Sequence, residues 1–120
     1  MTVADVVKWV LKHRRGRAFK DMSVYEIRAT IHFAVQSGGF IYTTDNHGHL
    51  TGLAVFVKDE ETKTATTGPV LTITRDSIGA ISKHFLDKYT DWHVRIHHRL
   101  GGISTRDGTK VLQRLSNRKN

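Results

Sequence analysis

The sequence predicts an α+β domain, in which one mixed and mostly antiparallel sheet is flanked by helices. Three observations predict it: two amphipathic helical patterns come first, three strand-like runs follow, and a further helical pattern separates these runs from a fourth strand. Because a helix that connects strands of one sheet packs against a face of that sheet, helices are expected on both faces. The predicted order is helix, helix, three strands, helix, strand, helix.

Two helical patterns open the chain, and each begins with residues that cap helices. Thr2 is expected to cap the first helix, and Ser23 and Glu26 have the spacing of a capping box for the second. A glycine follows each pattern and is expected to end the helix. The apolar residues at helical spacing, which we expect to be buried, are Val3, Val6, Val7, Val10 and Leu11 in the first helix and Val24, Ile27, Ile31, Ala34 and Val35 in the second.

Three strand-like runs follow the second helix. Residues 40–44 and 50–57 are predicted to be strands joined by a tight hairpin, because Asn and Gly in the turn 45–48 tolerate positive φ. The second of these strands is apolar on both faces, which is typical of a central strand covered on both sides. Residues 58–68 are polar and predicted to form a loop, and residues 70–74 are predicted to form the third strand.

The last part of the chain continues the alternation. Asp76 or Ser77 can cap the next helix, residues 92–99 are predicted to form the fourth strand, and a short helix is expected near 110–115. The apolar stripe of the helix before the fourth strand is Ile78, Ile81, Phe85, Leu86 and Tyr89. No repeat or linker interrupts the 120 residues, so we expect a single domain over 1–115 and a basic tail over 116–120.

Composition excludes several classes of protein. No apolar run approaches the roughly 20 residues that cross a bilayer, so no membrane partner is expected. Asp5 and Lys8 within the first helical pattern argue against a signal peptide. The absence of cysteine excludes disulfides and thiolate metal sites, and it fits a reducing compartment.

The net charge of +8 is concentrated at the two ends of the chain. Residues 1–20 contain six Lys and Arg against one Asp, residues 82–120 contain nine against three Asp, and residues 21–81 contain four against seven acidic residues. Such ends attract polyanions, which can be nucleic acid, a phosphorylated ligand or an acidic protein partner. The alternative is that the charge serves only solubility.

The segment Arg75-Asp76-Ser77-Ile78-Gly79-Ala80 lies where the third strand is expected to pass into a helix, and a helix start of this kind can bind anions. With the order of elements over residues 3–115, it resembles the GNAT superfamily of N-acetyltransferases. The phosphate pattern of that family is Gln or Arg, two residues, Gly, one residue, then Gly or Ala. The resemblance implies a GNAT-like domain with acetyl-CoA at this junction, and with Arg75, Ser77, Gly79 and Ala80 around its phosphates.

One position departs from that family pattern. Ile78 stands where the first glycine would allow main-chain amides to close on a pyrophosphate, and Asp76 brings negative charge to the same place. We therefore expect the acyl-CoA site to be degenerate. The compact domain, with a strand that begins with Trp and a basic turn over 92–102, resembles small proteins of tailed phages. Some of these are acetyltransferase-like and others are virion components. The resemblance implies a location in the cytoplasm of the host cell or within a phage particle.

Basic residues form two further candidate contacts with anions. In the fourth strand, alternation places His93, Arg95, His97 and Arg99 on one face, and the other candidate group, near the end of the first helix, is Arg14, Arg15 and Arg17. The first row can equally be the charged edge strand of a soluble sheet, and the second group can be a helix end that matches its own dipole.

The catalytic residue is not identified by the sequence. Glu26, Asp45 and His93 are candidates for a general base, although none is favoured by spacing and Glu26 is explained by its capping box. No metal site is expected, because the eight histidines have no spacing that brings three ligands together.

Three functional hypotheses follow. The favoured one is a GNAT-like domain, degenerate in its acyl-CoA site, that acts as a structural or interaction protein, for example in a phage particle. The first alternative is an active acyl-CoA-dependent N-acyltransferase. The second alternative is a basic nucleic-acid-binding protein, whose affinity would fall steeply with salt. An oligomer is compatible with each of them.

Overall fold

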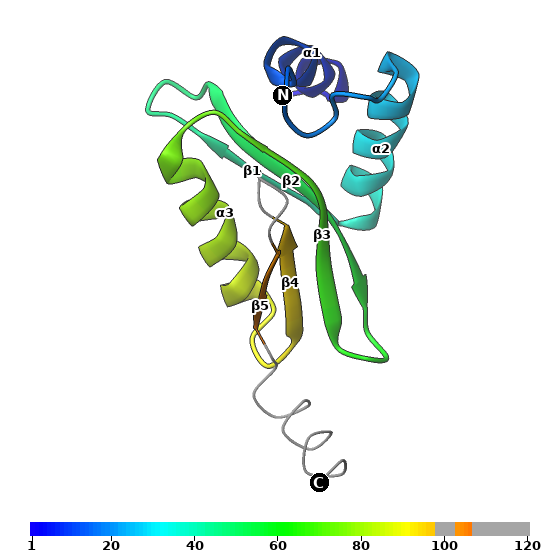
Figure 1. Cartoon of the computed structure of the whole chain (residues 1–120), viewed down its shortest axis with the longest axis vertical. Helices are drawn as coiled ribbons and strands as arrows, with labels where there is room; N and C mark the ends of the chain where they lie inside the picture. The colour runs from blue at the N-terminus through cyan, green and yellow to red at the C-terminus, as the bar shows by residue number, and fades with distance from the viewer. Residues whose placement is uncertain (98–102, 107–120) are drawn as a thin grey trace, which may run out of the picture.

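The computed structural model describes residues 1–97 and 103–106 (Figure 1). Over these residues the chain forms three helices and one five-stranded mixed sheet, which confirms the α+β class and the predicted order through the fourth strand. The elements are α1 (Val3–His13), α2 (Val24–Ser37), β1 (Phe40–Thr44), β2 (Leu50–Asp59), β3 (Thr64–Thr72), α3 (Arg75–Lys88), β4 (His93–His97) and β5 (Ile103–Arg106).

The sheet has the strand order β1-β2-β3-β4-β5. The pairs β1/β2, β2/β3 and β4/β5 are antiparallel, whereas β3 and β4 are parallel because α3 carries the chain from the end of one to the start of the other. The strand β5 was not predicted. The helix predicted near 110–115, the tail 116–120 and Arg99 lie outside the described residues.

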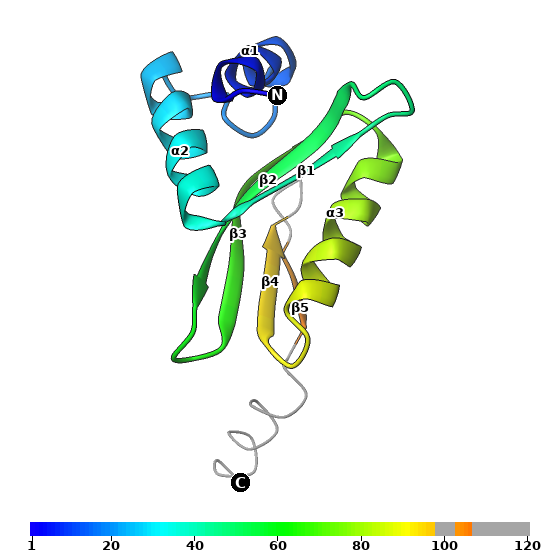
Figure 2. The same ribbon diagram turned by 180° about the vertical axis from the view of Figure 1, so that it is seen from behind.

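Each face of the sheet has its own hydrophobic core. One cluster joins α1 and α2 to Leu53, Val55 and Leu71, and the other joins α3 to Phe56 and Val94. The central strand β2 contributes to both clusters, which confirms that it is covered on both sides. Figures 1 and 2 show α3 along one side of the sheet and the α1–α2 pair beyond its other side.

Both predicted helix starts at the beginning of the chain are confirmed. Thr2 and Asp5 form one reciprocal capping box, and Ser23 and Glu26 form another. The second helix ends at Gly38, whose φ of 77° is accessible to glycine at little cost.

Some predictions of burial and of strand bounds were wrong. Val24 and Val35 are 53% and 47% exposed, because α2 buries only a narrow stripe against α1 and β2. Residues 58–68 are not one loop: β2 extends to Asp59 and β3 starts at Thr64, since cross-strand pairing extends the hairpin beyond the apolar residues. Val57 at this hairpin is 65% exposed.

Candidate functional site

The strands β3 and β4 pair over a short length and then separate. Their register runs only from Thr64 opposite His93 to Thr66 opposite Arg95. Beyond it, β3 bends toward the start of α3 and β4 does not follow, as Figure 1 shows. Within the described part of the chain, the second half of β3 therefore has a strand partner only on its β2 side. We call this opening between β3 and β4 the fork.

A β-bulge in β3 bends the strand at the fork. Gly68 and Pro69 together lie opposite Val55, between the regular pairs formed by their neighbours. A proline can occupy this place because the bulge requires no N–H from it, and a bulge increases the bend and twist of its strand. Gly68 is also tightly placed, since a Cβ there would lie 3.3 Å from Val55 Cγ2. The sequence Gly-Pro thus explains why β3 leaves β4.

The register of β3 determines which main-chain groups face the fork. Ile73 N donates a hydrogen bond to Thr51 O at 2.9 Å, and partners alternate along an antiparallel ladder. Val70 and Thr72, at the alternate positions, consequently direct their N–H and C=O groups away from β2. Arg17 Nη1 approaches this edge and donates to Thr72 O at 3.3 Å.

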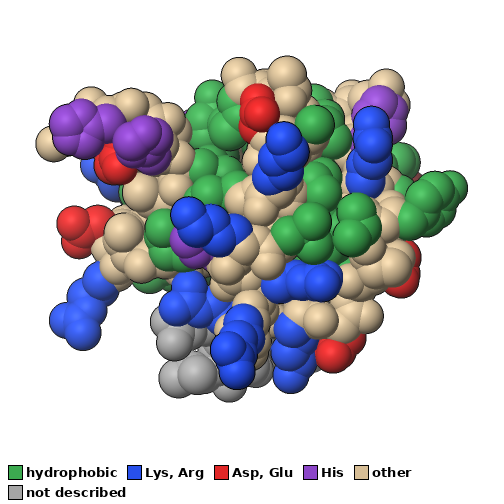
Figure 3. Space-filling view, turned by 90° about the horizontal axis from the view of Figure 1, so that it is seen from above, with side chains coloured by type: hydrophobic (Ala, Val, Ile, Leu, Met, Phe, Trp, Pro, Cys, Tyr) green, Lys and Arg blue, Asp and Glu red, His purple; other side chains and the backbone are tan. Residues whose placement is uncertain are grey.

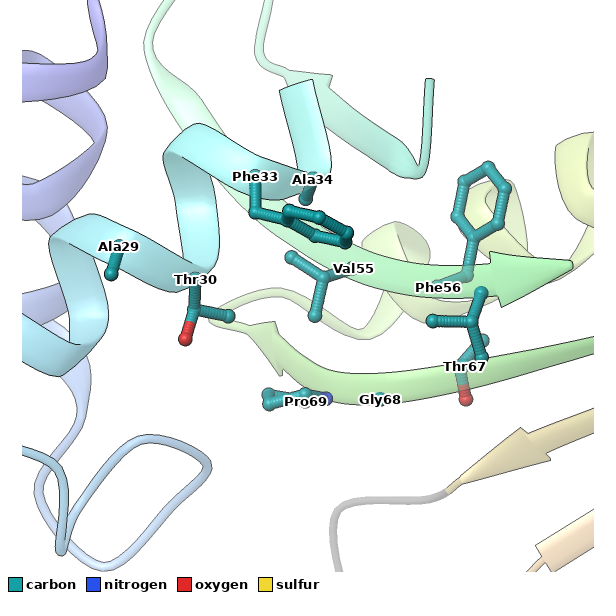
Figure 4. Close-up of a pocket in the computed structure, with 10 residues that line it drawn as sticks. Ala29, Thr30, Phe33, Ala34, Val55, Phe56, Thr67, Gly68 and Pro69 are labelled. Carbon is teal, nitrogen blue, oxygen red and sulfur yellow. The ribbon is translucent and has the colours of Figure 1, made fainter. Parts of the chain in front are cut away.

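An apolar groove of about 440 Å³ lies beside the fork, between α2, β2 and the bulge of β3. In Figure 4, Phe33 and Thr30 extend from α2 toward Val55 and Pro69. Phe33 is 67% exposed although it is aromatic. The residues that line the groove are Ala29, Thr30, Phe33, Ala34, Val55, Phe56, Val57, Thr67, Gly68 and Pro69. This groove was not predicted from the sequence, because the bulge in β3 brings residues 67–69 close to a helix that is far away in the chain.

The predicted passage from strand to helix exists at the end of β3, but its cap differs from the prediction. Thr74 is the N-cap of α3, in place of Asp76 or Ser77. The Thr74 hydroxyl accepts a hydrogen bond from Ser77 N at 3.2 Å and lies 2.5 Å from Ser77 Oγ. Ser77 is buried, and a Cβ on Gly52 would lie 3.0 Å from its Cβ. The first turn of α3 is therefore seated closely on the sheet and has its own polar partners.

The four residues predicted to surround the phosphates do not line one cavity. Ser77 and Ala80 line a groove of about 320 Å³ next to the β1–β2 hairpin, whereas Arg75 and Gly79 do not. Gly79 is exposed, with open space where a side chain would be. The same groove is lined by the carboxylates of Asp45 and Asp76. Because Asp76 lies in the first turn of α3, it already compensates the helix dipole there.

Asp45 is held as a carboxylate by the hairpin turn. Its Oδ1 accepts hydrogen bonds from His49 N at 2.9 Å and from His47 N at 2.8 Å, and His49 Nδ1 lies 3.5 Å from Oδ2. These contacts, first that of the His49 main chain, lower the pKa of Asp45 below its ordinary value. A fixed negative charge at this groove opposes binding of a pyrophosphate.

The basic residues near the end of α1 have different roles. Arg14 Nη1 donates to Met22 O at 2.6 Å and to Phe19 O at 3.4 Å, which ties down the α1–α2 loop. Arg17 reaches β3, and Arg15 is exposed. Figure 3 shows Lys and Arg side chains spread over this end of the molecule, with hydrophobic side chains exposed among them.

The strand β4 has the alternation that the sequence predicted. Val94 and Ile96 are buried against the α3 side of the sheet, while Arg95 is exposed and His93 is half-buried. His97 belongs to the strand, and its side chain lies outside the described residues. The proposed anion row is thus described at two of its four positions.

The candidates for a general base are far from equivalent. Glu26 is committed to its capping box and Asp45 to the hairpin turn, whereas His93 lies on β4 next to the parallel pairing with β3. Over residues 1–97 and 103–106, no group of three or more His, Asp and Glu could hold a metal ion. No helix in the described ranges has both the length and the apolar character needed to cross a membrane.

Comparison with known proteins adds nothing to the geometry. No protein family, curated protein or solved structure matches this chain.

Proposed function

We propose that this protein is a GNAT-like domain with a degenerate acyl-CoA site, which acts as a structural or interaction module. The observation that carries the proposal is the contrast between the groove beside the fork and the groove at the start of α3. Among the described residues, the groove beside the fork has no acidic residue in its lining, whereas the groove at the start of α3 is lined by Asp45 and Asp76, and Ser77 there is buried and hydrogen-bonded to Thr74. A site of this kind binds a ligand through apolar and main-chain contacts, without a phosphate cradle.

The second candidate function, an acyl-CoA-dependent N-acyltransferase, is favoured by the fork itself. Its open edge at Val70 could take the amide groups of a pantetheine arm, and the groove beside Phe33 could take the acceptor. This function would place the phosphates of acetyl-CoA next to the negative charge of Asp76. It would also need a general base, and no described residue is favoured for that role. Binding of nucleic acid by the basic residues stays a prediction.

Isothermal titration of the purified full-length chain with acetyl-CoA and with CoA separates the two candidates. We expect no heat of binding up to high micromolar ligand, and no acetylated product with a panel of amine acceptors. Saturable binding that is weakened in Arg75→Ala would overturn the proposal and favour the transferase. Lys83→Ala, which removes an exposed cation from the middle of α3, is the matched control for nonspecific attraction of the anionic ligand.

A further inference from the structure

The fork offers main-chain hydrogen-bonding groups at the edge of a strand. Val70 and Thr72 direct their N–H and C=O groups away from β2, and β4 pairs with β3 only as far as Thr66. The described residues supply one side-chain hydrogen bond to this edge, that of Arg17 to Thr72 O. Strand edges with unpaired groups are templates for the addition of another extended chain.

The apolar groove is continuous with this edge. Thr67, Gly68 and Pro69 belong both to β3 at the fork and to the wall of the groove, and Phe33 of α2 forms the opposite wall. In an extended chain, alternate side chains point to opposite faces of the sheet. A chain added beside β3 would therefore direct every second side chain toward α2, where the groove is.

Resting on the interaction function above, we propose that the fork binds an extended peptide segment of a partner protein, which adds to the edge of β3 and places an apolar side chain in the groove beside Phe33. The main-chain groups at Val70 and Thr72 fit a peptide, and the apolar lining fits an aliphatic or aromatic residue. Arg17 at the Thr72 end, within a chain of net charge +8, favours an acidic residue at that end of the segment.

The first test selects a ligand and measures its dependence on the groove. A yeast-displayed library of random 12-residue peptides is selected on the full-length protein, and the enriched peptides are synthesised and titrated by fluorescence anisotropy. We expect them to share an apolar residue flanked by Asp or Glu. Phe33→Ala should weaken their binding by about tenfold, as removal of a central aromatic contact does. Tyr25→Ala, which removes from α2 an even more exposed aromatic that does not line the groove, should change their binding by less than about twofold.

The second test locates the peptide at the edge. Amide hydrogen exchange should slow at residues 67–72 when the enriched peptide binds, because its main chain would protect the edge of β3. Three results would each overturn the fork proposal. These are enriched peptides that bind Phe33→Ala as tightly as the wild type, amide exchange at residues 67–72 that stays unchanged when the peptides bind, and a selection that enriches no peptide. None of these results affects the interaction function, which fails separately if acetyl-CoA binds or is turned over.

Discussion

Replacement of Gly52 by alanine tests how closely α3 is seated on the sheet. A Cβ at this buried position would lie 3.0 Å from Ser77 Cβ, 3.0 Å from Thr72 Cγ2 and 3.1 Å from Thr43 Oγ1. The three neighbours come from α3, β3 and β1, so no single side-chain rotation relieves all three contacts. Overpacking of this kind costs about 1–3 kcal/mol, and we expect Gly52→Ala to lower the free energy of unfolding by about 2 kcal/mol.

Gly79→Ala is the matched control, because it makes the same chemical change within α3, the helix that packs over Gly52, without a steric cost. Gly79 is exposed within α3, and no atom lies within 4 Å of the position of its Cβ. Alanine should raise the free energy of unfolding by about 0.5–1 kcal/mol, since glycine in a helix is the more flexible residue. Urea unfolding followed by circular dichroism measures both variants. Wild-type stability of Gly52→Ala, or a loss in Gly79→Ala, would refute the close seating of α3 that we describe.

Two further predictions concern the loops on either side of the site. Arg14→Ala should lower the free energy of unfolding by about 1–2 kcal/mol, because a charged hydrogen bond of 2.6 Å to Met22 O is lost, while Arg15→Ala should stay within about 0.5 kcal/mol of the wild type in the same urea titration. The lowered pKa of Asp45 means that its carboxylate stabilises the fold above the ordinary pKa of 3.8, and that this contribution disappears as the pH falls through the lower, folded value. The difference in stability between the wild type and Asp45→Ala should therefore shrink as the pH falls below 3.8, and a difference that still grows below pH 3.8 would contradict this account.

Local signals explain why much of the fold could be predicted. The capping boxes at Thr2 and Ser23 involve residues three apart, and the hairpin at 45–48 depends on its own turn residues, so neighbouring sequence determines them. The alternation along β4 likewise predicted that Arg95 and His93 share one face of the sheet, and Val94 and Ile96 on the other face are buried. These features depend little on distant parts of the chain.

The errors arise where distant segments decide the structure. Val35 has the helical spacing of a core residue, but among the described residues no element covers that side of α2, and Val35 is 47% exposed. The polar residues Thr64 and Thr66 form a strand because β2 and β4 pair with them. Thr74 caps α3 in place of Asp76 or Ser77 because β3 ends at Thr72, whereas the sequence predicted that the strand continues through Thr74.

The candidate site was harder to predict than the fold for a related reason. A phosphate cradle has a local signature, so its partial loss at Ile78 could be read from the sequence. The groove has no such signature, since Phe33 and Pro69 lie far apart in the chain and meet only because the bulge bends β3 under α2. The two features also respond differently to sequence change. The start of α3 depends on Thr74 and Ser77, whereas the fork depends on Gly68 and Pro69. The proposed loss of a phosphate site at the start of α3 and the proposed peptide surface at the fork can therefore be tested by separate substitutions.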